Sequence, residues 1–340
     1  MVSDIMNTSM ETTVTKADLA ECSDYIQKCR AEVALRVVGQ NSVIDGILMA
    51  LVAGGHVLLE GVPGLAKTLV VRTVADVSGL DFKRIQFTPD LLPADVTGTL
   101  IYEQATGSFS VRKGPVFANV VLADEINRAP AKVQSALLEA MAEHQVTIGE
   151  TTYKLPNPFF VLATQNPIEQ EGTYNLPEAE LDRFLLKLEV PYPKPEEEME
   201  IVRTMGNAAS VPVKKIFSAQ ALQKCRTAVE AITADDKILQ YIVSLISVTR
   251  PAQEKNSQAH RNDILRYISF GASPRAGIAM LKCAKVNALF QNRSFVLPED
   301  VQAVAQQVLA HRLVLSYEAS ADNVTASDLI SKIIDLMPLP

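Results

Sequence analysis

The sequence predicts an α/β fold in which a parallel-sheet core is followed by a smaller all-α domain. Short apolar runs at 56–59, 120–123 and 159–163 predict the core, because they have the length of buried strands and lead into glycine or polar residues. The second domain is predicted by the change after the proline-rich stretch 191–195, where β-branched runs become rare and helical spacing dominates. A chain of 340 residues is also too long for one compact core.

The first apolar run leads into a turn that predicts phosphate binding. Backbone N–H groups in a tight turn between a strand and a helix point toward an anion, and the helix dipole adds positive potential. The residues expected at the nucleotide are Gly61, Pro63, Gly64, Leu65, Ala66, Lys67, Thr68 and Leu69. Lys67 is expected to reach the β- and γ-phosphates, and the Thr68 hydroxyl to bind Mg²⁺. Ala66 stands where a second glycine is usual, and we expect it to have helical backbone angles.

Two carboxylates follow the second apolar run. Asp124 is expected to bind Mg²⁺, through a water molecule, and Glu125 to polarise the water that attacks the phosphate. The alternatives are a chance glycine-rich turn and a helix-capping acidic pair, but the two motifs together favour nucleotide hydrolysis. The third run ends at Asn166, whose amide could orient the attacking water or contact the γ-phosphate; a turn-forming Asn before Pro167 is the alternative.

Two arginines complete the candidate site. Arg183 stands just before a further predicted strand, 185–190, and an arginine offered to a neighbouring subunit's nucleotide stabilises transition-state charge. An isolated arginine is more often a surface residue or half of an ion pair. Arg275 follows Ser273 and Pro274 at a helix start, from which it could reach phosphate out of the second domain.

Taken in order, these motifs resemble those of the AAA+ ATPases, and closely those of the MoxR family in the helix-2-insert group. The matching segments are Walker A at 61–68, Walker B at 122–125, sensor 1 at Asn166, the arginine finger at 181–184 and sensor 2 at 273–276. Three further stretches are typical of that family, at 86–93, 124–130 and 163–167. The resemblance covers nearly the whole chain from Val37 onward.

The resemblance implies a P-loop NTPase core with a helical lid, Mg²⁺ and ATP as cofactors, and a homo-oligomeric ring, expected to be a hexamer. It assigns catalytic roles to Glu125, Asn166, Arg183 and Arg275, and it makes Val38 and Gly39 candidates for contact with the base. Arg128 is the competing candidate for a contact to the neighbouring subunit.

The same resemblance gives the expected domain boundaries. They are an N-terminal helical segment (1–35), an AAA+ core (36–192), a linker or hinge (193–210) and a helical lid (211–340). Hairpins are expected at 97–111 and 146–153, where glycines separate strand-like runs. Such hairpins could contact a client in the pore of the ring or could only pack between subunits.

Composition limits the possible partners. A net charge of −7 and a pI near 5.3 argue against nucleic-acid binding, and the basic doublets, such as Lys83–Arg84, are interpreted as solvated. Four cysteines without metal-ligand spacing indicate ordinary thiols in a reducing compartment. Neither the N-terminus, interpreted as carrying no secretory signal, nor any apolar run predicts membrane insertion, so a cytoplasmic location is expected.

We therefore expect an ATP-hydrolysing ring that remodels partner proteins during maturation or during cofactor or metal insertion. The resemblance also suggests a partner with a von Willebrand A domain; the chain has no Asp-x-Ser-x-Ser motif, so this partner would be a separate polypeptide. The alternatives are a nucleic-acid-directed AAA+ motor and a nucleotide-dependent regulatory switch that does not hydrolyse ATP.

Overall fold

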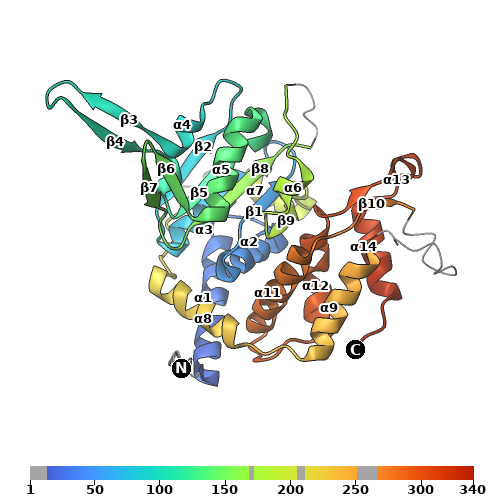
Figure 1. The fold of residues 1–340 in the computed structure, drawn as a ribbon. Coiled ribbons are helices and arrows are strands. Elements are labelled where there is room, and N and C mark those ends of the chain that lie inside the picture. Colours follow the sequence, from blue (N-terminus) through green and yellow to red (C-terminus); the bar gives the residue numbers. More distant parts are fainter. Residues whose placement is uncertain (1–13, 168–171, 205–210, 251–265) are drawn as a thin grey trace, which may run out of the picture.

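The core of the molecule is a parallel sheet with the strand order β2-β5-β8-β1-β9. The computed structural model describes residues 14–167, 172–204, 211–250 and 266–340 (Figure 1). The strands are β1 (Val57–Glu60), β2 (Phe82–Gln86), β5 (Val120–Asp124), β8 (Phe160–Gln165) and β9 (Leu186–Glu189). Because all five strands are parallel, their carboxyl ends meet at one edge of the sheet.

Apolar side chains of the central strands alternate between two clusters, one on each face of the sheet. In β1, Val57 and Leu59 join the cluster formed with α1, α2, α3 and the lid helices, whereas Leu58 joins the cluster formed with α5. The helices of the core are α1 (Lys16–Ala34), α2 (Asn41–Ala53), α3 (Lys67–Ser78), α4 (Pro93–Thr97), α5 (Ala131–Glu143) and α6 (Glu178–Leu181). Residues 1–13, where we expected no secretory signal, lie outside the described residues.

Two hairpins extend from the core, as predicted. The first pairs β3 (Gly98–Glu103) with β4 (Ser108–Lys113) and projects far from the body (Figure 1). The second pairs β6 (Gln145–Ile148) with β7 (Thr151–Lys154) and contacts the base of the first. We call the β3–β4 hairpin the arm.

The remaining elements form the lid beside the sheet. Its helices are α8 (Ala219–Ala231), α9 (Asp236–Val248), α11 (Pro274–Phe290), α12 (Pro298–Leu309), α13 (Tyr317–Ala321) and α14 (Ala326–Leu336), with a small antiparallel pair, β10 (Ile268–Phe270) and β11 (Val314–Leu315). The helical character of the lid is confirmed, apart from this strand pair. Helix α8 packs against α1, α2 and α11, and Lys224 on it is ion-paired with Asp18 and Glu21 of α1. Within the described residues, no helix combines the length and the apolar character needed to cross a membrane.

The stretch expected to be a linker contains a helix. Helix α7 (Pro195–Arg203) begins with Pro195 at its first turn, a position where the missing N–H of proline costs nothing. The prolines at 191 and 193 precede this helix, and Pro195 opens it. Residues 205–210 of the linker lie outside the described part of the chain.

Candidate nucleotide-binding and hydrolysis site

The phosphate-binding turn lies at the carboxyl edge of the sheet. The N–H of Gly61, directly after β1, donates to the carbonyl of Gln165 at the end of β8, 3.3 Å away. Lys67 is the first residue of α3, and its Nζ donates to the carbonyl of Gly61. Burial lowers the pKa of Lys67, while the carboxylates of Asp124 and Glu125 nearby oppose that shift. The ammonium group therefore stands between the turn and the two carboxylates, where a phosphate could be held.

The backbone of Ala66 differs from our expectation. It has φ 55° and ψ 20°, in the left-handed region, and caps the N-terminus of α3; Gly64 before it has φ 87°. The expectation of helical angles was wrong because the chain must reverse its direction immediately before α3 to enclose an anion. For a residue with a Cβ, the left-handed conformation costs about 1–2 kcal/mol.

A cavity of about 210 Å³ beside the turn is the candidate base pocket. It is lined by Val38, Leu65, Ala66 and Leu69, which the sequence indicated, and by Arg36, Pro193, Ile201 and Thr204, which it did not. The last three come from the segment expected to be a linker, so α7 closes this cavity. Gly39 does not line it; its φ of 68° lies in the left-handed region, which favours glycine, and a Cβ there would also meet the Glu197 carboxylate of α7.

Asp124 accepts hydrogen bonds from two neighbouring strands. Thr164 Oγ1 on β8 donates to Asp124 Oδ1 at 2.6 Å, and Arg84 on β2 donates to Asp124 Oδ2 from Nη2 at 2.6 Å and from Nε at 3.0 Å. Arg84 is exposed, as interpreted from the sequence, but its guanidinium also pairs with Asp124, which the sequence did not indicate. The Arg84 guanidinium is hydrogen-bonded to Asp124, the carboxylate that we expect to bind a cation.

Glu125 is held by three polar contacts. Its N–H donates to Thr164 Oγ1 at 2.8 Å, and its Oε2 accepts from Gln86 Nε2 at 2.7 Å and pairs with Arg128 Nη1 at 3.2 Å. It has a left-handed backbone, with φ 57°. Arg128, the competing candidate for a contact between subunits, is thus paired with a carboxylate of its own chain. Asn166 follows β8 at the same sheet edge and is 6% exposed.

Arg183 and Arg275 lie together in a second cavity, of about 280 Å³, at the junction of core and lid. Arg183 Nη1 donates to the carbonyl of Leu138 at 3.1 Å, and Arg275 Nη1 lies 4.0 Å from Asp182 Oδ2. The Arg275 side chain is 63% exposed. This cavity shares no lining residue with the candidate base pocket. The structure therefore groups Arg275 with Arg183 and not with Lys67.

The oxygen donors at the phosphate-binding turn suit a hard cation. Thr68 supplies a hydroxyl and Asp124 a carboxylate, and Asp124 already has a cationic partner in Arg84. No group of three or more His, Cys, Asp and Glu side chains that could hold a metal occurs among the described residues. All four cysteines are buried and free.

Comparison with known proteins shows the family. Residues 56–186 match the ATPase family associated with various cellular activities (AAA), and residues 261–333 match the AAA lid domain. The chain is 47% identical to Chaperone MoxR1 of Mycobacterium tuberculosis over 93% of this chain and 82% of that protein. It is 31% identical to Protein MoxR of Methylorubrum extorquens over 95% of this chain and 98% of that one.

A solved structure agrees with the fold. A crystal structure of a protein from Cytophaga hutchinsonii superposes with a TM-score of 0.87, is 47% identical and covers 96% of this chain and 98% of its own. The AAA match spans the phosphate-binding turn and the Asp124–Glu125 pair, and the lid match spans Arg275. The chain is an ATPase and belongs to the MoxR family of AAA+ proteins.

Proposed function

We propose that the protein couples Mg²⁺-dependent ATP hydrolysis in a homo-oligomeric ring, expected to be a hexamer, to the remodelling of partner proteins. The observation that carries the ring is the separation of the two cavities. Arg183 and Arg275 line a cavity that shares no residue with the base pocket of their own chain. Two arginines so placed can serve the nucleotide of an adjacent subunit, where they would stabilise the charge that develops on the transferred phosphate.

The residues at the sheet edge would divide the chemistry among them. Lys67 would exchange the carbonyl of Gly61 for the β- and γ-phosphates, and Glu125 would orient and polarise the attacking water. Thr68 and Asp124 would hold Mg²⁺, which when bound neutralises phosphate charge. Asn166 would contact the water or the γ-phosphate from the neighbouring strand.

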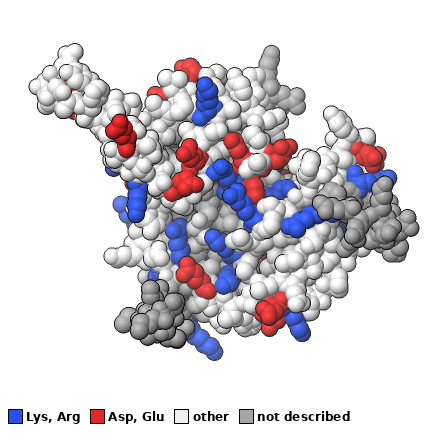
Figure 2. All heavy atoms as spheres, viewed as in Figure 1, with Lys and Arg blue, Asp and Glu red and all other residues white. Residues whose placement is uncertain are grey.

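The arm supports a protein client over a nucleic acid. Tyr102 is 55% exposed and Phe109 is 68% exposed, and their ring centroids lie 5.3 Å apart on the hairpin. Figure 2 shows mostly uncharged residues at the end of the arm, and the sequence from 98 to 111 contains no Lys or Arg. A strand-tracking surface would need basic side chains there.

A chaperone-like role fits this surface, and MoxR1 is named a chaperone. The client, a separate von Willebrand A-domain partner and a cytoplasmic location remain parts of the proposal. Capture of partners by the Glu125→Gln variant, which should bind ATP without hydrolysing it, would identify the client. Replacing both Tyr102 and Phe109 with Ser in that variant provides the control, because it should abolish capture of a client that binds the arm.

A subunit-mixing experiment tests the ring. Glu125→Gln chains keep Arg183 but lose the carboxylate that polarises water, whereas Arg183→Ala chains keep the carboxylate. Each should lose at least about 100-fold in kcat alone. Mixed assemblies should regain activity at every site where an intact Glu125 faces an intact Arg183. Absence of any gain in assemblies shown to be mixed would contradict a role for Arg183 across the interface, and wild-type turnover by Glu125→Gln would reject Glu125.

A further inference from the structure

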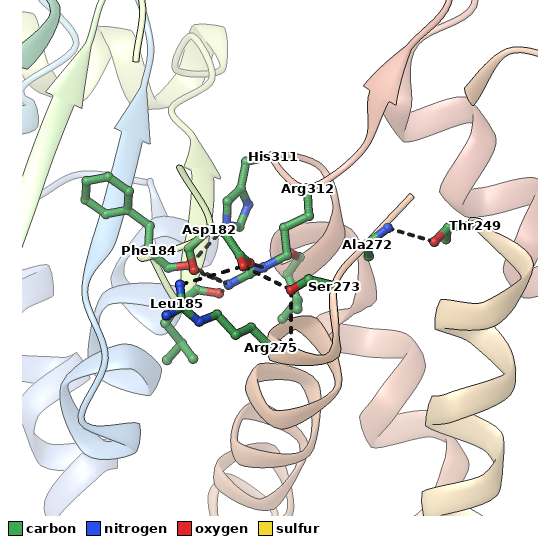
Figure 3. Close-up of polar contacts among 10 residues, drawn as sticks. Asp182, Phe184, Leu185, Thr249, Ala272, Ser273, Arg275, His311 and Arg312 are labelled. Atoms are coloured by element: carbon green, nitrogen blue, oxygen red, sulfur yellow. Dashed lines mark hydrogen bonds and ion pairs between the residues drawn. The ribbon is translucent and has the colours of Figure 1, made fainter. Parts of the chain in front are cut away.

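Arg312 of the lid is buried against the segment that carries Arg183 (Figure 3). Its side chain is 3% exposed, and its Nε donates to Asp182 Oδ1 at 2.7 Å. Nη2 donates to the carbonyl of Phe184 at 2.7 Å, and Nη1 donates to the carbonyl of Leu185 at 3.2 Å. The remaining donors reach the carbonyls of Asp182 and Val308, so all five N–H groups of the guanidinium are used.

Other lid residues reinforce the same contact. His311 Nε2 lies 3.1 Å from the carbonyl of Phe184, and Ser273 Oγ donates to Asp182 Oδ2 at 3.0 Å. The Phe184 side chain is fully buried in the core, and its carbonyl is held by the lid, so both domains fix the position of this residue. We call the contacts of Arg312, His311 and Ser273 with residues 182–185 the clamp.

The clamp holds the two neighbours of Arg183 in sequence and leaves the Arg183 side chain itself outside these contacts. The two residues that flank Arg183 in sequence, Asp182 and Phe184, are both held by the lid, whereas Arg183 itself is exposed. On the core side, the segment is a short connection between the four-residue helix α6 and strand β9. The lid therefore holds the backbone on either side of Arg183 through Arg312, while Nη1 of the Arg183 side chain donates to the carbonyl of Leu138 in the core.

We propose that Arg312 is a positioning residue for Arg183, so that the lid of each subunit sets the arginine that acts on the next subunit's nucleotide. This inference rests on the function of Arg183 proposed above. A guanidinium is required because only its planar fork can satisfy one carboxylate and several carbonyls at once. Misplacing a catalytic group by about 1 Å can cost on the order of 100-fold in rate, so a small shift of the clamp is enough to lower kcat.

The competing interpretation is that Arg312 only fastens core to lid. A purely structural residue would disturb its own subunit's site, whereas a positioning residue for Arg183 would disturb the neighbour's. Arg312→Lys keeps the charge but loses the fork, and we expect kcat to fall by about 10- to 100-fold. Binding of a fluorescent ATP analogue to the same variant should be unchanged, because the base pocket is separate from the clamp.

Mixing experiments separate the two interpretations. Arg312→Lys chains mixed with Glu125→Gln chains should regain activity, because sites with an intact Glu125 then face a well-placed Arg183. The same chains mixed with Arg183→Ala chains should gain nothing, because neither kind supplies a working arginine. The reverse pattern, gain with Arg183→Ala and none with Glu125→Gln, would overturn the proposal.

Two controls complete the design. The mixture of Glu125→Gln with Arg183→Ala tests the proposed function itself; if it gains activity and the Arg312→Lys mixture does not, only the positioning role fails. Arg293→Lys breaks a bidentate ion pair with Asp300 inside the lid, away from the clamp, and should not show the trans pattern. Should Arg312→Lys fail to fold, Asp182→Asn removes the charge on the other side of the pair, and the same mixing pattern is expected from it, with a smaller loss of kcat.

Discussion

Two arginine–aspartate pairs of this molecule stand beside functional residues, and they are built differently. Arg84 and Asp124 pair at 2.6 Å next to Glu125, with 48% of the Arg84 side chain exposed. Arg312 and Asp182 pair at 2.7 Å next to Arg183, with 3% of the Arg312 side chain exposed. The first guanidinium also contacts Gln86 and solvent, whereas the second uses every donor on buried or partly buried acceptors.

The difference indicates different tasks. In the Arg84–Asp124 pair the aspartate is buried but the guanidinium is half exposed, so water can solvate the guanidinium and the aspartate can exchange its partner, as a cation-binding aspartate must. A buried arginine with all donors satisfied is held in one geometry, because any movement leaves polar groups unpaired. The two regions also differ in backbone strain. Ala66 and Glu125, at the candidate nucleotide site, have left-handed backbone angles, whereas no described residue of the clamp does.

The largest expected effect is on stability. Arg312→Met should lower the free energy of unfolding by about 3–5 kcal/mol, because it leaves a carboxylate and several carbonyls without their donor. Arg84→Met should lower it by no more than about 1 kcal/mol. Urea unfolding followed by circular dichroism would compare the two variants. An equal loss of unfolding free energy in the two variants would show that burial of the arginine does not determine how much each ion pair stabilises the protein.

The stability of the protein should also depend on pH through His56, which lines the same cavity as Arg183 and Arg312. Burial lowers the pKa of His56 to about 4; Nε2 lies 3.3 Å from the carbonyl of Met141, and Nδ1 accepts from the N–H of Val161. An unfolded histidine titrates near 6.5, so between pH 6.5 and 4 the unfolded chain binds a proton that the folded chain does not. Stability should therefore fall as pH drops through this range, by about 3 kcal/mol from this group.

Unfolding measured against pH would test this dependence. His56→Gln should flatten the profile in part, and a remaining slope is expected from His311, whose pKa burial also lowers. His144→Gln provides the comparison: His144 is exposed, and its charge is only a minor cause of the lowered pKa of His56, so its replacement should change the profile less than His56→Gln. If the dependence of unfolding free energy on pH were the same in His56→Gln as in the wild type, His56 would not be the source of the loss of stability in acid.

The sequence predicted those parts of the fold that depend on local pattern. The strands β1, β5 and β8 are continuous apolar runs, and the lid helices follow helical spacing, so both could be recognised. Strand β2 was missed because it lies at the sheet edge, where only Ile85 of its five residues is buried. Helix α7 was missed because the prolines at 191, 193 and 195 and the acidic residues that follow them are typical of a linker.

The site was predictable where chemistry follows a contiguous motif, as in 61–68 and 124–125. Contacts between distant segments could not be predicted in the same way. The Arg84–Asp124 pair depends on strand register, which places Gln86 beside Asp124, and the clamp joins residues 130 positions apart. Neither Arg84 nor Arg312 has a local signature that separates it from an ordinary surface arginine.

The Arg84–Asp124 pair should have a modest effect on Mg²⁺ binding. Arg84→Met should tighten the apparent affinity for Mg²⁺, in the presence of an ATP analogue, by up to about five-fold, because Asp124 no longer has to release a guanidinium. The Mg²⁺ midpoint of analogue fluorescence measures this change without relying on turnover. Lys83→Met removes the adjacent charge, which has an exposed side chain on the same strand, and should shift the midpoint less. Weaker Mg²⁺ binding in Arg84→Met would mean that Arg84 helps to hold the bound nucleotide instead of competing with the cation.

The smallest expected effect concerns the strain at Ala66. Ala66→Gly should raise the free energy of unfolding by up to about 1 kcal/mol, because the relief of a left-handed alanine exceeds the extra entropy of glycine in the unfolded chain. The control is Ala303→Gly, at an exposed position in the middle of α12, where the same substitution should cost about 1 kcal/mol. Opposite signs for one substitution in two places would show that the nucleotide side stores backbone strain. A loss of stability in both variants would mean that the turn around Ala66 is relaxed, and the contrast with the clamp would then rest on burial alone.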